Sequence, residues 1–113
     1  TKEYAREVLS DIVANKLENI TIESIQKKVA HFFKLRVTDL KSKSRHRSLV
    51  RPRQIAMYLA RKHTPLSLPT LGLRFGDKDH TTIINACQRI ELLLNSDPTM
   101  RSNISELERQ LNT

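Results

Sequence analysis

Apolar residues recur at helical spacing along most of the chain, most clearly between Leu68 and Leu94. In the first part of this run the pattern ends at Gly76, a residue that can adopt positive φ and stop a helix. Asp79 then follows as a good N-cap, because its carboxylate can accept unpaired backbone N–H groups of a first turn. The apolar residues beyond it share one helical face and are Ile83, Cys87, Ile90 and Leu94. The pattern predicts a short helix, a tight turn and a longer helix.

The same periodicity predicts further helices on both sides of this unit. We expect them over residues 3–17, from the N-cap Thr21 to about residue 37, over residues 49–63, and after Asp97. Thr38 is expected to cap a single turn that ends at Leu40. Pro52 is expected in the first turn of its helix, where no N–H donor is needed. No strand pattern of convincing length occurs, so the predicted fold class is all-α.

The run from Leu68 to Leu94 has the form of a helix-turn-helix motif, in which the tip of the second helix enters the major groove of DNA. The second helix begins with His80, Thr81 and Thr82. Their imidazole, hydroxyl and methyl groups suit base edges and thymine methyl groups. A structural alternative stays open for each residue: His80 packs at the edge of the helix, and the threonines are ordinary first-turn residues.

The positive charge of the chain is concentrated in one segment. The 113 residues carry a net charge of +8, and residues 40–76 hold nine Lys or Arg side chains and no acidic one. The densest part is the serine-rich stretch 41–48, which has no apolar period and is predicted to be a loop. This distribution favours a polyanionic partner that is bound through phosphates or a minor groove. The alternative is a solvated run of charge.

Composition favours a single helical domain and argues against catalysis. With two glycines, no tryptophan and 4% aromatic residues, the core must consist mainly of aliphatic side chains. Cys87, the one cysteine, lies on an apolar face and is interpreted as a buried hydrophobe. We find no metal-ligand spacing, glycine-rich phosphate loop or framework for a catalytic triad, so no enzyme is expected. No apolar run approaches the ~20 residues of a membrane span, and no signal peptide pattern occurs.

Two runs of sequence carry a resemblance to a known family. They are Ser-Leu-Val-Arg-Pro-Arg-Gln-Ile-Ala-Met-Tyr-Leu-Ala at residues 48–60 and Leu-Gly-Leu-Arg-Phe-Gly-Asp-Lys-Asp-His-Thr-Thr-Ile-Ile-Asn-Ala-Cys at residues 71–87. Together they resemble the C-terminal DNA-binding domain of the bacterial chromosomal replication initiator DnaA. The combination of Asp-His-Thr-Thr with an upstream Arg-Pro-Arg-Gln is highly specific. The resemblance covers residues 21–113, and residues 1–20 resemble the helix that connects this domain to an ATPase module.

The resemblance implies a monomeric domain, with a helix-turn-helix related to that of Trp repressor, that binds short asymmetric A·T-rich boxes. It implies base contacts by Arg45 in the minor groove and by Arg53, Gln54, Asp79, His80 and Thr81 in the major groove. Contacts to the DNA backbone are implied for Lys43, Arg47, Arg61, Leu68, Pro69, Lys78 and Thr82. The chain departs from the family where Asp77 and Lys78 replace the common Gly-Arg, and at Thr64-Pro65-Leu66.

The expected function is sequence-specific binding of double-stranded DNA at origin boxes, to initiate chromosomal replication in the bacterial cytoplasm and on the nucleoid. By the same resemblance, ATP belongs to the ATPase module, and no cofactor is expected in this chain. Regulatory proteins and acidic phospholipids are candidate further partners. Three alternatives stay open: a transcription repressor of the Trp-repressor type, an adaptor that binds a protein through its basic face, and a surface for acidic lipids.

Overall fold

The computed structural model of the chain describes residues 20–112. Within this range the chain forms six helices and no strand, which confirms the predicted all-α fold. The helices are α2 (Ile22–Phe32), α3 (Val37–Lys41), α4 (Arg47–His63), α5 (Leu68–Arg74), α6 (His80–Ser96) and α7 (Pro98–Leu111). The helix expected over residues 3–17 lies outside the described residues.

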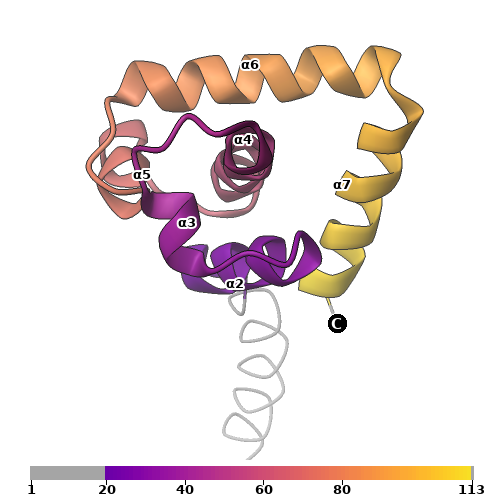
Figure 1. Ribbon diagram of the computed structural model, residues 1–113, viewed down its shortest axis with the longest axis horizontal. Helices are drawn as coiled ribbons and strands as arrows, with labels where there is room; N and C mark the ends of the chain where they lie inside the picture. The colour runs from indigo at the N-terminus through magenta and orange to yellow at the C-terminus, as the bar shows by residue number, and fades with distance from the viewer. Residues whose placement is uncertain (1–19, 113) are drawn as a thin grey trace, which may run out of the picture.

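α4 lies in the middle of the domain, and the other helices surround it (Figure 1). In that view α6 passes above α4, α7 stands to its right, and α2 lies below. Aliphatic side chains from all six helices form the core around α4. Fully buried members include Ile25, Val29, Leu40, Leu59, Leu71, Ile83, Ile90 and Leu107. These residues lie on the apolar faces that the sequence periodicity predicts.

α2 begins and ends where local contacts satisfy its free backbone groups. Thr21 and Ser24 form a capping box, in which each hydroxyl accepts a hydrogen bond from the other residue's backbone N–H, at 3.1 and 2.9 Å. At the other end Lys34 adopts φ 57°, and its N–H and the next one bond back to carbonyls of the last turn. The helix therefore ends at Phe32, earlier than the expected end near residue 37.

α3 is a single short helix whose start differs from the prediction. The expected cap at Thr38 is wrong, because the N-cap is Arg36 and Thr38 lies inside the first turn. The Arg36 backbone N–H donates to the Asp39 carboxylate at 2.9 Å. The Asp39 carboxylate, three residues after the N-cap, therefore stabilises the start of the helix, and the Thr38 hydroxyl does not cap it.

α4 begins at Arg47, earlier than the expected residue 49. His46 is its N-cap, since the Nδ1 atom accepts the Ser48 backbone N–H at 3.3 Å and lies 2.8 Å from the Ser48 hydroxyl. Pro52 therefore falls in the second turn, and its expected place in the first turn is wrong. Pro52 has no N–H to donate to the Ser48 carbonyl, but it is buried, so packing offsets part of that loss.

The starts of the last three helices agree with the sequence prediction. The Ser67 hydroxyl caps α5, and the Asp79 carboxylate caps α6. Asp97 serves two helices: its backbone N–H donates to the Leu93 carbonyl of α6 at 2.7 Å, and its carboxylate accepts the Thr99 N–H of α7 at 3.0 Å. α7 therefore turns away directly from the end of α6 (Figure 1).

The position of Leu59 in the core gives a first prediction. Leu59 is 0% exposed in the middle of α4, so its truncation leaves a cavity. We expect Leu59→Ala to lower the free energy of unfolding by about 2–5 kcal/mol in urea melts. Leu92→Ala is the matched control, because Leu92 is 63% exposed on α6, and its loss should stay below about 0.5 kcal/mol. Equal losses of free energy of unfolding for the two variants would contradict the placement of Leu59 in the core.

Candidate nucleic-acid interface

The start of α6 presents exposed polar residues on a capped first turn. The Asp79 Oδ1 atom accepts the Thr81 backbone N–H at 3.4 Å and lies 3.0 Å from the His80 Nδ1 atom. The His80 side chain is 54% exposed, which argues against the alternative that it packs at the helix edge. Thr81 and Thr82 are exposed as well. The Asp79 carboxylate thus orients the imidazole through Nδ1 and leaves Nε2 available to a partner.

The turn between α5 and α6 depends on two glycines. Gly76 has φ +90°, and a Cβ atom there would lie 1.9 Å from the carbonyl oxygen of Lys41 in α3. A Cβ atom on Gly72 would lie 2.1 Å from the carbonyl oxygen of Lys78. Neither position accepts a side chain without a shift of the backbone. At Gly76 the turn of the helix-turn-helix is therefore in direct contact with the end of α3.

The basic loop between α3 and α4 is shorter than the expected 41–48. Lys41 ends α3 and Arg47 starts α4, so the loop covers residues 42–46. Its serine hydroxyls accept hydrogen bonds from the backbone: Ser42 from the Ser44 N–H at 3.4 Å, and Ser44 from the His46 N–H at 3.2 Å. Such local bonds compete with a helical backbone, which explains why this serine-rich run forms a loop.

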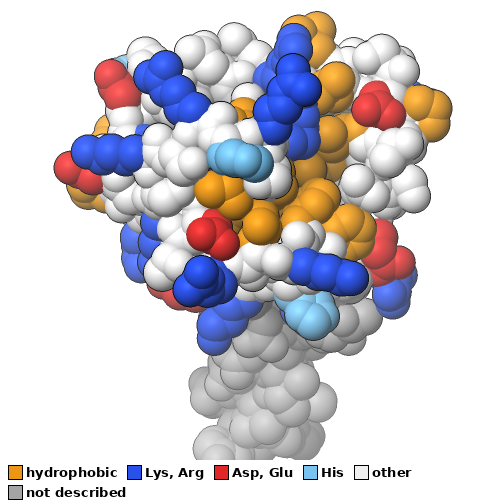
Figure 2. Space-filling view, in the orientation of Figure 1, with side chains coloured by type: hydrophobic (Ala, Val, Ile, Leu, Met, Phe, Trp, Pro, Cys, Tyr) orange, Lys and Arg blue, Asp and Glu red, His pale blue; other side chains and the backbone are white. Residues whose placement is uncertain are grey.

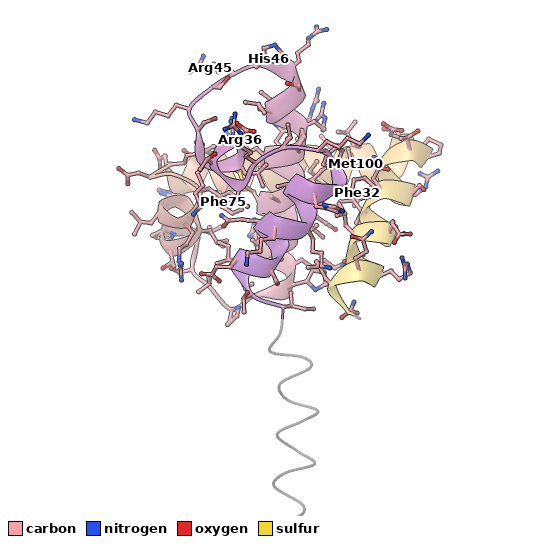
Figure 3. All side chains as sticks on the ribbon, turned by 60° about the horizontal axis from the view of Figure 1, so that its bottom comes forward. Phe32, Arg36, Arg45, His46, Phe75 and Met100 are labelled. Atoms are coloured by element: carbon pink, nitrogen blue, oxygen red, sulfur yellow. The ribbon has the colours of Figure 1, made fainter. Side chains whose placement is uncertain are left out.

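Three cations of this region face solvent. Lys43, Arg45 and Arg47 are exposed, and Arg45 and His46 lie at the crest of the loop, away from the body of the domain (Figure 3). Lys and Arg side chains project from the face that the loop crosses (Figure 2). The loop therefore offers positive charge where a polyanion can approach it.

The apolar pattern of residues 49–63 predicts that Arg53 lies on an outer face of its helix. This prediction is wrong, because Arg53 is 8% exposed. All three guanidinium nitrogens donate to the segment before α4: Nε to the Leu40 carbonyl at 3.2 Å, Nη1 to the Ser44 carbonyl at 2.8 Å, and Nη2 to the Asp39 carbonyl and the Ser42 hydroxyl, both at 3.0 Å. Burial lowers the pKa of the Arg53 guanidinium and the Asp39 carboxylate opposes that shift, so the side chain stays charged. Its base contact stays a prediction.

Lys78 is half-buried in the turn before α6. Its Nζ atom donates to the Phe75 carbonyl and, at 3.2 Å, to the Lys41 carbonyl. Burial, together with the charges of Arg53 and Lys43, lowers the pKa of this ammonium to about 8. The ammonium links the turn to the end of α3, and its expected contact with the DNA backbone stays a prediction.

The other expected contact residues lie on α4 and α5. Gln54 is half-buried on α4, where its Oε1 atom accepts a hydrogen bond from Arg51 Nη1 at 2.7 Å. Arg61 is exposed near the end of the same helix. Leu68 and Pro69 form the first turn of α5. Their contacts with DNA stay predictions.

A hollow of about 270 Å³ joins the loop to α4 and α6. Its lining includes Arg45 from the loop, Gln54 from α4, and Thr82 and Asn85 from α6. Residues expected at the minor groove and at the major groove therefore open onto one concave surface. Asn85 is not among the residues predicted from the sequence. It lies about one helical turn beyond Thr82, and that spacing is the signal that points to it.

Other kinds of site find no support in residues 20–112. In this range no three or more His, Cys, Asp or Glu side chains are grouped so that they could hold a metal ion. Cys87 is 2% exposed and burial raises the pKa of its thiol, which confirms that it is a buried hydrophobe. None of the helices described is long and apolar enough to cross a membrane.

Comparisons with known proteins find the same family. A family model described as the bacterial dnaA protein helix-turn-helix matches residues 22–90. The chromosomal replication initiator proteins DnaA of Ehrlichia ruminantium (strain Gardel) and Geobacter sulfurreducens are 47% and 49% identical to this chain over 98% of its length. The chain covers 24% and 25% of those proteins, so it spans about a quarter of the curated relatives that it matches.

A solved structure agrees with this assignment. The crystal structure of a DNA replication initiation factor superposes with a TM-score of 0.72 at 29% sequence identity, over 94% of this chain and 32% of that one. The matches confirm the resemblance carried by the two sequence runs.

The cap of α6 gives the second prediction. Asp79→Ala removes the acceptor of the Thr81 N–H and the partner of His80, so it should lower the free energy of unfolding by about 0.5–2 kcal/mol. Asp79→Asn keeps a capping oxygen and should retain most of that stability. The measurement is thermal unfolding of both variants. If Asp79→Asn loses as much free energy of unfolding as Asp79→Ala, the capping hydrogen bond contributes less stability than the structure indicates.

Proposed function

The chain belongs to the family of bacterial DnaA helix-turn-helix domains, and from that premise we propose that it binds double-stranded DNA at short A·T-rich boxes of a replication origin. The observation that carries the proposal is the shared hollow, where Arg45 of the basic loop and Thr82 of α6 line one surface. A duplex on this surface meets α6 with its major groove and the loop with the adjacent minor groove.

In this proposal the first turn of α6 reads base edges in the major groove. His80 offers its Nε2 atom, and Thr81 offers a hydroxyl and a methyl group, which suits a thymine methyl. The Asp79 carboxylate is an acceptor for a cytosine amino group, and the Gln54 amide of α4 matches adenine. Each of these side chains is exposed or half-exposed in the free domain.

The basic loop supplies the minor-groove contact. Arg45, at the crest of the loop, enters the groove where an A·T tract makes it narrow and strongly negative. Lys43 and Arg47 lie on either side of Arg45 in the sequence and bind phosphates, which positions the domain without reading sequence. Further backbone contacts are assigned to Arg61, Leu68, Pro69 and Thr82.

The chain acts by binding and not by catalysis. ATP binding and origin unwinding are assigned to the ATPase module that the resemblance implies, and no cofactor is assigned to this chain. Regulatory proteins and acidic phospholipids are proposed as further partners of the whole protein, which would act on the nucleoid.

The third prediction tests DNA binding against the alternatives. In gel shifts with an origin box, a scrambled duplex and anionic vesicles as competitors, the box should compete best. The logarithm of the affinity should fall linearly with the logarithm of the salt concentration, with a slope of about −0.9 per phosphate contact. A slope near zero, or better competition by vesicles, would contradict the proposal. A dimer in sedimentation that prefers palindromes would instead support a repressor of the Trp-repressor type.

The fourth prediction concerns discrimination between sequences. His80→Ala and Thr81→Ala should each remove about 1–3 kcal/mol of the preference for box over scrambled DNA, with little effect on thermal stability. Thr99→Ala is the matched control, because Thr99 has the same place after a capping aspartate on α7 and its N–H makes the same bond. A variant that melts earlier but keeps its preference would show that the residue is structural.

A further inference from the structure

Two cationic side chains end on the same short stretch of backbone. α3 has five residues, so the carbonyls of its last turn have few partners within the helix. Arg53 binds the carbonyls of Asp39 and Leu40, and Lys78 binds the carbonyl of Lys41. Cations are favoured at this end of a helix by its unpaired carbonyls and its dipole. The end of α3 is therefore held by α4 on one side and by the turn before α6 on the other.

The guanidinium of Arg53 also reaches beyond α3 into the loop. Its Nη1 atom donates to the Ser44 carbonyl at 2.8 Å, and its Nη2 atom donates to the Ser42 hydroxyl at 3.0 Å. A planar guanidinium meets several acceptors in one fixed geometry, and an ammonium does not. Ser44 directly precedes Arg45, so the bond to the Ser44 carbonyl fixes the backbone from which Arg45 projects.

The turn before α6 is attached to the same segment. The Lys41 carbonyl oxygen lies 1.9 Å from the position that a Cβ atom of Gly76 would occupy, and it accepts a hydrogen bond from Lys78 Nζ at 3.2 Å. Lys78 directly precedes Asp79, the cap of the helix proposed to enter the major groove. The loop and the start of α6 thus share one anchoring point.

We infer that Arg53 and Lys78, which also line the hollow assigned to the duplex, are positioning residues that hold the basic loop in register with α6 and act on DNA through the loop. This inference rests on the DNA-binding function proposed above. Ordering a free loop on binding costs conformational entropy, which lowers affinity. A loop that is held beforehand presents Arg45 to the minor groove without that cost.

The fifth prediction has one part that needs no DNA. Arg53→Lys keeps the positive charge but removes the planar guanidinium and most of its hydrogen bonds, so the loop should become mobile. NMR order parameters of residues 43–46 should fall from the rigid value of about 0.85 to below about 0.6. Lys78→Met should lower them in the same direction by a smaller amount. Arg101→Lys is the matched control: Arg101 Nη1 donates to the Leu94 carbonyl at 2.9 Å, a similar bond distant from the loop in sequence, and the loop should keep its order.

The second part is a double-mutant cycle with Arg45. In the wild-type background Arg45→Ala should weaken binding to a box with an A·T tract by about fivefold or more, and in the Arg53→Lys and Lys78→Met backgrounds by less than about twofold, because a mobile loop no longer presents Arg45. The difference between these losses is the coupling expected for residues that act together. If Arg53 reads a base itself, the affinity losses from Arg45→Ala and Arg53→Lys multiply in the double variant. Arg53→Lys then lowers the preference for one particular base pair in the major groove.

The outcomes separate this inference from the function on which it rests. Unchanged loop order in Arg53→Lys and Lys78→Met overturns the inference, whatever the DNA result. The inference is also overturned if the losses of DNA affinity from Arg45→Ala and Arg53→Lys multiply in the double variant. If the wild-type chain shows no preference for the box, the proposed function fails, while the order parameters still report whether the two residues hold the loop. Should Arg53→Lys fail to fold, Lys78→Met carries both measurements.

Discussion

A buried guanidinium needs acceptors, and that requirement organises one side of this domain. Moving a charge out of water costs several kcal/mol unless hydrogen bonds replace the lost hydration. Arg53 meets the requirement with three carbonyls and one hydroxyl, all within residues 39–44. The loop after α3 therefore takes its shape from a side chain of α4. The turn of the helix-turn-helix packs against the same stretch, where Gly76 leaves room for the Lys41 carbonyl.

This arrangement separates packing from recognition along a single helix. The buried residues of α6 begin at Ile83, and the residues before it are exposed and held by the Asp79 cap. The polar tip is therefore available for contacts that the core does not need. The loop follows the same principle, since its shape depends on Arg53 and its serines while Lys43 and Arg45 face solvent. Both proposed contact surfaces thus extend from parts of the domain whose packing and hydrogen bonds are already formed without DNA.

The sequence predicts the helices well where side-chain period and capping chemistry are local. The apolar face of α6 and its Asp79 cap follow from the sequence of residues 79–94 alone. Arg53 could not be placed in this way, because its acceptors are backbone carbonyls 9 to 14 positions earlier in the chain. The bond from Lys78 to the Lys41 carbonyl could not be predicted for the same reason, since the two residues lie 37 positions apart. Long cationic side chains look alike in a sequence, whether they bind phosphates or satisfy the backbone.

We propose that one rigid surface of the domain reads two adjacent grooves of the same duplex. Selection of bound sequences from a random duplex library tests it most directly, because the library imposes no box in advance. We expect a single asymmetric motif, with defined base pairs for the tip of α6 and an A·T tract on the side of the basic loop. Recovery of a palindrome, or of no motif at all, would contradict it.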